Sequence, residues 1–355
     1  LIKNTFGCVR FVYNYYLVKR EEMYKTQGIT LNYVSCSKDL TQLKQANTWL
    51  KEVDKFALQN ALKDLDKAFK NFFEGRAEYP KFKKKREGYQ SYRTTFTNNN
   101  IEIRDSRIRL PKLGWVKFAK SRDIEGRILN AVISRTPTGK YFVSICCRID
   151  DVKKLPKTDK VIGIDLGLKH FLVDSNGSKI EHPRYLIKLE KKLIREQRRF
   201  SRKEKGSNNY KKQLLRLAKV YEKIKNQRED FLHKLSSKII NENQVVILED
   251  LKVKNMLRNN TLSKSISDSG WGKLIDMLEY KALWYGRTIV KLDTFYPSSQ
   301  ICSSCGYRNE KIKDLSVREW KCPECKTKHD RDINAAKNIL KQGIKCLGLC
   351  IAINQ

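Results

Sequence analysis

Three acidic positions along the chain have the residue types that a metal-dependent reaction requires. Asp165 and Glu249 each end a run of apolar residues, and Asp332 lies where a helical pattern begins. Hard divalent cations prefer oxygen ligands, and two such ions can hydrolyse a phosphodiester when several carboxylates converge on them. Gly163 and Gly167 flank Asp165, and we expect them to leave room beside its carboxylate.

The elements around these residues predict a sheet and a helix that hold the carboxylates in place. The apolar residues before Asp165 and Glu249 are typical of strands buried on both faces of a sheet. Two strands and a helix with one carboxylate each form the arrangement of ribonuclease H. Each acidic residue taken singly also fits a solvated turn residue or a helix cap. Their joint occurrence, with the cysteines that lie between them, favours a nuclease.

Four cysteines have the spacing of a zinc site. Cys302 and Cys305 form one Cys-x-x-Cys pair, Cys322 and Cys325 form another, and sixteen residues separate the pairs. Two such knuckles can present four sulfurs to one tetrahedral ion. Two disulfides are the alternative, but the absence of a visible signal peptide favours a reducing compartment. We expect structural Zn²⁺; His329 lies close enough to compete for the ion, but four thiolates already fill its shell.

These motifs, in this order, resemble the TnpB family, which comprises transposon-encoded RNA-guided DNA nucleases related to type V CRISPR nucleases. The resemblance covers nearly the whole chain, and its strongest passages are Gly-Ile-Asp-Leu-Gly at 163–167, Leu-Glu-Asp-Leu-Lys-Val-Lys-Asn-Met at 248–256, residues 271–302, the two cysteine pairs, and Asp-Arg-Asp-Ile-Asn-Ala-Ala-Lys-Asn-Ile at 330–339. It implies that Asp165, Glu249 and Asp332 are RuvC-like catalytic carboxylates that bind two Mg²⁺ ions. It also implies that Asp250 and Asp330 are not catalytic.

The charge of the chain indicates a polyanionic partner. It has 74 Lys and Arg against 39 Asp and Glu, a formal net charge of +35, and nucleic acid is the usual partner for such an excess. A basic protein at a membrane surface is the alternative, but no run of ~18 apolar residues and no lipidation signal is visible. The resemblance implies a guide RNA and double-stranded target DNA as partners, one copy of the chain per guide RNA, and a bacterial or archaeal cytoplasm, at the nucleoid.

The pattern changes along the chain, which predicts a multidomain α+β protein. Helical periodicity comes first, and short runs that alternate apolar and polar residues between turns follow. Two long basic helices, broken near Gly206, are predicted between 183 and 241. The second has Leu214 and Leu217 in its apolar stripe. The resemblance implies a wedge strand ahead of residue 1, which we expect to be missing here. It assigns a helical recognition domain at 1–88, a β-barrel wedge domain at 89–157, a RuvC-like nuclease domain at 158–297, a zinc ribbon at 298–328, the last nuclease helix at 329–341 and a C-terminal tail at 342–355.

Five further residues are candidates for reading DNA. A helix predicted over 48–73 has a face away from its apolar stripe, and a polar loop follows in the next segment. The resemblance implies that residues on this face and in this loop recognise a short DNA motif flanking the target: Lys55, Phe56, Gln59, Thr97 and Asn98. A solvated helix face and a turn asparagine kept for its backbone conformation are the plainer interpretation.

We therefore expect an RNA-guided DNA endonuclease that cleaves beside a short flanking motif by two-metal hydrolysis. A guide-directed DNA-binding repressor without cleavage is one alternative, although the presence of all three carboxylates argues against it. Strand transfer of the transposase type is another, and no feature of the sequence excludes it. A zinc-ribbon nucleic-acid-binding protein without enzymatic activity would leave the three acidic motifs unexplained.

Overall fold

The chain forms two compact units in the computed structural model. Unit 1 spans Leu1–Asp151 and unit 2 spans Val152–Gln355, and the structure describes residues 1–85, 88–150, 152–259, 261–314 and 316–348. Half of the predicted C-terminal tail, residues 349–355, lies outside this described part. Within the described residues, no helix is long and apolar enough to cross a membrane.

Unit 1 combines helices and small antiparallel sheets around one core. Leu58 and Leu62 of its third helix belong to the same buried cluster as Ile108 and Ile133 of its strands, so the helical and β segments are packed together. Its helices are α1 (Ile2–Gln27), α2 (Tyr33–Ala46), the 3₁₀ turn η1 (Thr48–Lys51) and α3 (Lys55–Phe73). One antiparallel sheet has the order β1 (Gln90–Thr95), β5 (Arg127–Arg135), β6 (Tyr141–Arg148). The other has the order β2 (Glu102–Arg104), β3 (Arg107–Leu110), β4 (Gly114–Lys117).

The helix predicted over 48–73 is shorter in the structure. Its first residues form the separate 3₁₀ turn η1, and α3 begins at Lys55 because Asp54 caps it, its carboxylate accepting a hydrogen bond from the Phe56 amide at 3.0 Å. Asn60 then ties α3 to β1 by donating to the Arg93 carbonyl at 2.9 Å.

Unit 2 is built on a five-stranded sheet in the order β11-β10-β7-β8-β9. The strands are β7 (Val161–Asp165), β8 (His170–Asp174), β9 (Lys179–Glu181), β10 (Val245–Glu249) and β11 (Thr288–Leu292). The first three form an antiparallel meander, whereas β10 and β11 run parallel to β7. This is the topology of a ribonuclease H-like sheet, so the predicted RuvC-like α+β class agrees with the structure.

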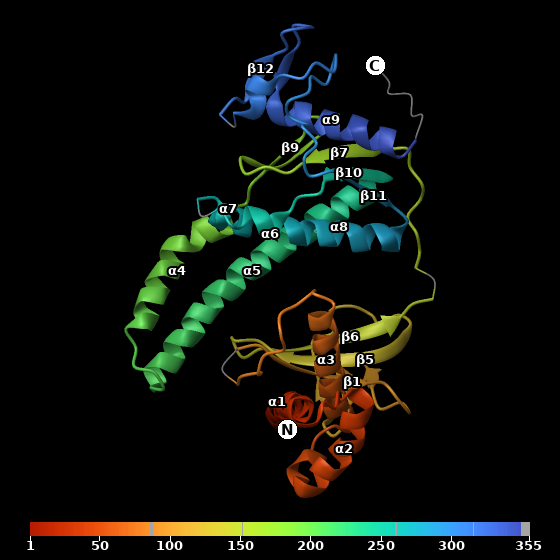
Figure 1. The fold of residues 1–355 in the computed structure, drawn as a ribbon, viewed down its shortest axis with the longest axis vertical. Helices are drawn as coiled ribbons and strands as arrows, with labels where there is room; N and C mark the ends of the chain where they lie inside the picture. The colour runs from red at the N-terminus through yellow and green to blue at the C-terminus, as the bar shows by residue number, and fades with distance from the viewer. Residues whose placement is uncertain (86–87, 151, 260, 315, 349–355) are drawn as a thin grey trace. The chain divides into compact units, whose positions relative to one another are not determined.

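Helices cover both faces of this sheet (Figure 1). Val246 and Leu248 of β10 pack in one core with α5 (Asn208–Glu242) and α8 (Trp271–Tyr285), and Val245 and Ile247 pack in another with α9 (Arg331–Cys346). Burial on both faces explains the unbroken apolar run before Glu249. The other elements are α4 (Tyr185–Ser201), α6 (Val253–Met256), α7 (Ser263–Ser269), η2 (Glu310–Lys313), β12 (Glu319–Lys321) and β13 (Lys328–Asp330).

Close packing of α9 on β7 explains one glycine and corrects its predicted role. A Cβ atom built at Gly163 would lie 2.4 Å from the Ala336 carbonyl oxygen and 2.6 Å from the Leu340 amide nitrogen. Gly163 therefore admits the backbone of α9, whereas we had expected it to leave space beside Asp165. The helix also continues past the predicted end at residue 341, because Ile344 is buried in the core that it shares with β10.

Candidate active site and zinc ribbon

The topology places the first two predicted carboxylates at the same edge of the sheet. Ile164 of β7 lies opposite Leu248 of β10 in a parallel pair, so Asp165 and Glu249 are the next residues on two adjacent strands. Asp332 is the second residue of α9, which packs directly against β7. Burial, followed by the negative charges of Glu249 and Asp332, raises the pKa of Asp165 to about 8. The structure therefore brings the three carboxylates into one electrostatic group.

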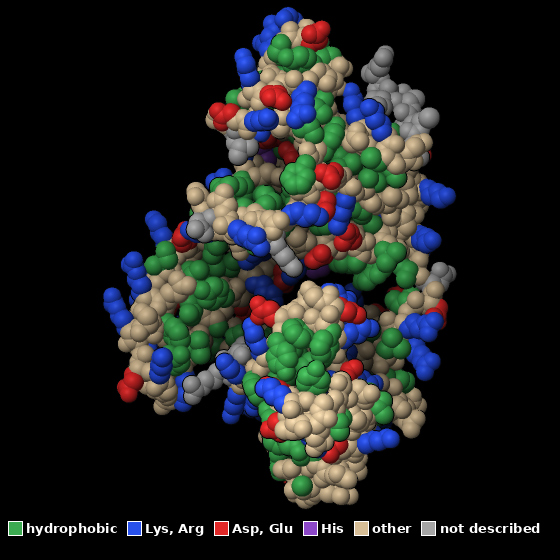
Figure 2. Space-filling view, viewed as in Figure 1, with side chains coloured by type: hydrophobic (Ala, Val, Ile, Leu, Met, Phe, Trp, Pro, Cys, Tyr) green, Lys and Arg blue, Asp and Glu red, His purple; other side chains and the backbone are tan. Residues whose placement is uncertain are grey.

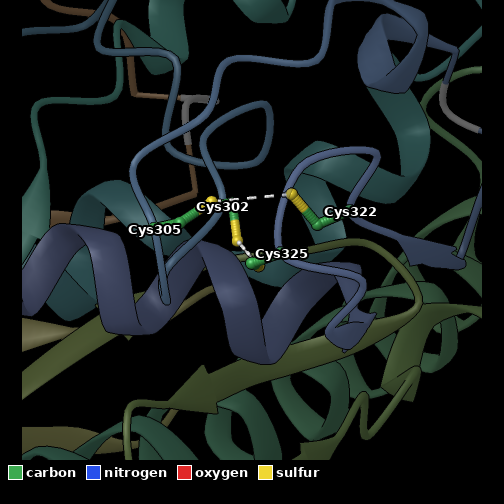
Figure 3. Close-up of side chains that lie close together, drawn as sticks. All are labelled: Cys302, Cys305, Cys322 and Cys325. Carbon is green, nitrogen blue, oxygen red and sulfur yellow. Dashed lines mark hydrogen bonds between the residues drawn. The ribbon is translucent and has the colours of Figure 1, made fainter.

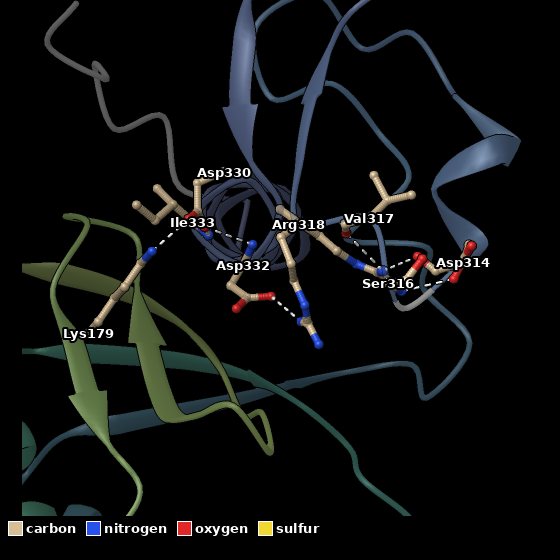
Figure 4. Close-up of polar contacts among 9 residues, drawn as sticks. Lys179, Asp314, Ser316, Val317, Arg318, Asp330, Asp332 and Ile333 are labelled. Carbon is tan, nitrogen blue, oxygen red and sulfur yellow. Dashed lines mark hydrogen bonds and ion pairs between the residues drawn. The ribbon is translucent and has the colours of Figure 1, made fainter.

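Glu249 and Asp332 each have a polar partner that the sequence analysis did not identify. The Ser298 hydroxyl donates to Glu249 Oε1 at 2.5 Å; burial raises the pKa of Glu249, and this hydrogen bond opposes that rise. Arg318 Nη1 lies 3.7 Å from Asp332 Oδ1 (Figure 4). Ser298 lies in a passage that carries the family resemblance, but its pairing with a residue 49 positions earlier leaves no local signal.

The neighbouring acidic residues have other functions in the structure. A hydrogen bond from Lys252 lowers the pKa of Asp250. Asp330 caps α9: its Oδ1 accepts from the amides of Asp332 at 3.1 Å and Ile333 at 3.0 Å, while its Oδ2 pairs with Lys179 Nζ at 2.6 Å (Figure 4). Asp330 thus orients the first turn of the helix that carries Asp332.

The three carboxylates form the kind of oxygen donor set that Mg²⁺ takes in proteins. Burial raises the pKa of both Asp165 and Glu249, and at Asp165 the charges of Glu249 and Asp332 add to this rise; a divalent cation would favour the charged carboxylates. Their oxygens are more widely spaced than the ribbon sulfurs. Across the described residues, the four ribbon cysteines are the one group whose potential ligand atoms all lie within 4.8 Å of one another.

These cysteine sulfurs have the spacing of a tetrahedral metal site (Figure 3). Cys302 Sγ lies 3.6 Å from Cys325 Sγ, and Cys305 Sγ lies 3.6 Å from Cys322 Sγ. With Zn–S bonds of about 2.3 Å, two sulfurs at the tetrahedral angle lie about 3.8 Å apart. The residues therefore fit a four-thiolate structural zinc site.

Two buried asparagines join the ribbon to α9. Asn334 Oδ1 accepts from the Ser303 amide at 2.8 Å, and its Nδ2 donates to the Ile301 carbonyl at 2.7 Å. Asn338 Nδ2 donates to the Ser298 carbonyl at 2.7 Å. Their spacing of four residues places both side chains on one helix face. The Asn-Ala-Ala-Lys-Asn passage thereby holds the first cysteine knuckle, a role that we did not predict.

The five predicted DNA-reading residues all lie in unit 1. On α3, Lys55 is exposed with its Nζ 5.0 Å from the centre of the Phe56 ring, and Gln59 is half-buried. Thr97 is half-buried and Asn98 is exposed with a φ of 47°. The left-handed backbone alone can account for an asparagine there, so a role in reading DNA stays a prediction.

A basic groove follows the helical hairpin of unit 2. A cavity of about 440 Å³ lies between α4 and α5 and is lined by Leu189, Lys192, Glu196, Arg199, Arg216, Lys219, Val220 and Lys223. Lys and Arg side chains also stand along the outer edge of the hairpin (Figure 2). Such a surface suits contacts with a phosphate backbone.

Comparison with known proteins gives consistent matches. Family models described as a probable transposase, a Cas12f1-like TNB domain and a helix-turn-helix domain match residues 144–260, 271–339 and 1–28. A candidate RNA-guided DNA endonuclease of Streptomyces pristinaespiralis is 38% identical over 97% of this chain and 85% of its own length. The candidate RNA-guided DNA endonuclease InsQ of Escherichia coli K12 is 33% identical over 95% of this chain and 87% of its own.

A solved structure shares the fold. The Cas12f1 chain in a cryo-EM complex with single guide RNA and target DNA matches 95% of this chain and 81% of that chain with a TM-score of 0.56 at 17% identity. The sheet topology, the acidic residues at its edge, the cysteine ribbon and the two long alignments agree with one another. The chain belongs to the TnpB family.

Proposed function

We propose that this chain is an endonuclease that cleaves DNA at a site selected by a bound guide RNA and next to a short flanking motif. The observation that carries the proposal is that Asp165 and Glu249 end adjacent strands while Asp332 lies in the first turn of the helix packed on β7. The chain is also 38% identical to a candidate RNA-guided DNA endonuclease. Two bound divalent ions, with Mg²⁺ expected, would activate the attacking water and stabilise the leaving oxygen.

Each proposed ligand has contacts within the chain that would hold it in position. Asp165 is held by the ladder between β7 and its neighbours, and Glu249 is oriented by Ser298. Asp332 is held by the cap at Asp330 and by the packing of α9. The arrangement presents one carboxylate from each of three elements, which fixes their separation before any substrate binds.

The remaining parts are assigned to nucleic-acid recognition and to structural support. Unit 1 would supply the recognition helices and the wedge sheets, with Lys55, Phe56, Gln59, Thr97 and Asn98 facing the flanking motif. The basic groove between α4 and α5 would contact the backbone of the guide–target heteroduplex, which RNA-guided effectors hold by shape and charge. The four cysteines would hold structural Zn²⁺.

The test uses the full chain with its own guide, identified by sequencing the RNA that copurifies with it. Asp332→Asn removes one ligand charge at constant shape, and we expect it to abolish plasmid cleavage while guide and target binding persist. Asp250→Asn, one residue past a predicted ligand, is the matched control and should cleave normally. Robust cleavage by Asp332→Asn would refute the site. A wild-type chain that binds but never cuts would favour the repressor, and joined DNA ends would favour strand transfer.

A further inference from the structure

His329 lies between the zinc ribbon and α9, the helix that contains Asp332. It is the middle residue of β13, where it lies opposite Trp320 of β12, and its buried ring stands 4.9 Å from the Trp320 ring at 40°. Its Nε2 lies 3.0 Å from Cys302 Sγ. A buried imidazole nitrogen that close to a metal-binding sulfur is either a ligand to the same ion or a hydrogen-bond partner of the sulfur.

The distances distinguish these two roles. With Zn–S bonds of about 2.3 Å and Zn–N bonds of about 2.0–2.1 Å, a sulfur and a nitrogen bound at the tetrahedral angle lie about 3.6 Å apart. The observed 3.0 Å is about 0.6 Å shorter than two ligands of that geometry require. It lies within hydrogen-bond reach, at the short end for a sulfur acceptor. The two cysteine pairs, each at 3.6 Å, already provide four ligands at suitable distances.

We propose that His329 donates its Nε2–H to the Cys302 thiolate and, through β13, makes the zinc site part of the frame that positions Asp332. A metal-bound thiolate can only accept hydrogen bonds, so the imidazole must be the donor. Such a bond offsets part of the thiolate charge in a buried setting and holds the sulfur in place when the other ligands fluctuate. Outer-shell partners of this kind influence metal affinity strongly.

The path from the sulfur to the carboxylate is short and continuous. His329 is followed by Asp330, whose carboxylate caps α9 by accepting from the amide of Asp332 itself. On the other side of the knuckle, the Ser303 amide donates to Asn334 one half-turn further along the same helix. The first turn of α9 is therefore bonded to the ribbon on both sides. The part of the inference that concerns Asp332 rests on the proposed function; the part that concerns zinc does not.

The first test measures zinc release from the full chain, without any nuclease readout. Zinc-loaded protein is mixed with the chromogenic chelator 4-(2-pyridylazo)resorcinol, and the release rate is followed by absorbance. His329→Phe keeps a ring against Trp320 but removes the donor, and we expect release to be about 10- to 100-fold faster. His329→Gln retains an N–H near the same point, so its zinc-release rate should stay within about threefold of the wild-type rate. Lys328→Ala, an exposed neighbour on β13, is the matched control and should be unchanged.

Two results of this test would overturn the proposal. One is release from His329→Phe at the wild-type rate. The other is release from His329→Gln as fast as from His329→Phe, which would show that the N–H does not matter. If His329→Phe fails to fold, the zinc-release rate of His329→Gln still tests the proposal. Loss of an outer-shell partner is expected to speed release about tenfold or more, so an increase of that size in His329→Gln would contradict the donor role.

The second test separates a donor from a ligand and reads the link to Asp332. Co²⁺ replaces Zn²⁺, and the visible bands of wild type and His329→Phe should both be those of a four-sulfur site, displaced only slightly by loss of the hydrogen bond. Bands of a three-sulfur, one-nitrogen site in wild type would reveal nitrogen ligation and overturn the donor assignment. Zinc-saturated His329→Phe should also cleave about tenfold more slowly, the lower end of the loss expected for an outer-shell partner, with recovery in His329→Gln. Normal cleavage would overturn the link to Asp332. Absence of cleavage in wild type would refute the proposed function instead, and zinc release would then decide the inference alone.

Discussion

Replacement of Gly163 by alanine tests whether close packing of α9 on β7 positions the active site. The added Cβ would meet the Ala336 carbonyl oxygen at 2.4 Å and the Leu340 amide nitrogen at 2.6 Å, about 1 Å short of ordinary van der Waals contact. Both atoms belong to helix backbone, so no rotamer change can relieve the overlap. The helix must move away from the strand, and Asp332 in its first turn moves with it.

The size of the effect follows from that displacement. Overpacking a well-packed core costs typically about 1–3 kcal/mol, and removing a glycine returns about 0.5–1 kcal/mol of unfolded-chain entropy. The net loss of stability is therefore modest. Activity is more sensitive, because a misplacement of about 1 Å at a catalytic group can cost about 100-fold in rate. We expect Gly163→Ala to lose far more cleavage than stability.

The assay compares the first-order cleavage rate at saturating guide and target with the melting temperature of the same preparation. Gly272→Ala is the matched control, because a Cβ there meets no atom within 4 Å and the substitution lies inside α8. It should cleave normally and melt slightly higher. Wild-type cleavage by a folded Gly163→Ala protein would show that the spacing of α9 from β7 does not set the geometry of the carboxylates.

Three further predictions concern other parts of the chain. Gly343→Ala should destabilise α9, since all three atoms nearest the new Cβ belong to Ile247. In a double-mutant cycle, Ile247→Ala should relieve this overlap, so that the loss of stability in the double variant is about 0.5–3 kcal/mol smaller than the sum of the single losses. Strict additivity in melting experiments would count against this contact. Cys305→Ser should reduce zinc from about one ion per chain and lower solubility, and unchanged metal content by elemental analysis would contradict the ribbon. Gln59→Ala should relax the flanking-motif preference at one position by roughly 1–3 kcal/mol, the value of a bidentate base contact. Asn98→Gly removes the side chain but keeps the left-handed backbone, and it should also change the preference. An unchanged preference for both variants in a randomised flanking-sequence depletion assay would show that these residues are a solvated helix face and a turn.

The sheet of unit 2 was predictable because local pattern and burial agree there. The residues before Asp165 and Glu249 are apolar without interruption, which is what strands covered by helices on both faces require. The stripe on the second long helix was less reliable. Leu217 is buried as predicted, but Leu214 is 45% exposed. The face of α5 that packs against α4 runs through Gln213, Leu217 and Val220, so it is rotated from the predicted stripe.

The groups that orient the carboxylates could not be predicted, for a different reason. Ser298 and Arg318 contact Glu249 and Asp332 across the fold, and Lys179 reaches Asp330 from 151 residues away. Their residue types are common and their spacing has no period, so only the three-dimensional arrangement identifies them. Gly163 illustrates the same limit: the glycine was visible, but the helix that requires it lies some 170 residues further along the chain.

The three carboxylates depend on the rest of the fold to different degrees. Asp165 and Glu249 end adjacent strands, so the hydrogen-bond ladder fixes them relative to each other. Asp332 has no such ladder. Its position depends on the fit of α9 at Gly163, on the cap at Asp330 and on the bonds from the zinc ribbon, and these act at different points of one helix. Loss of any one leaves the other two to hold the helix, so single changes should slow cleavage without unfolding unit 2. Distant substitutions that impair catalysis should therefore act mainly through Asp332, and combining two of them should reduce the rate by more than the product of their separate effects.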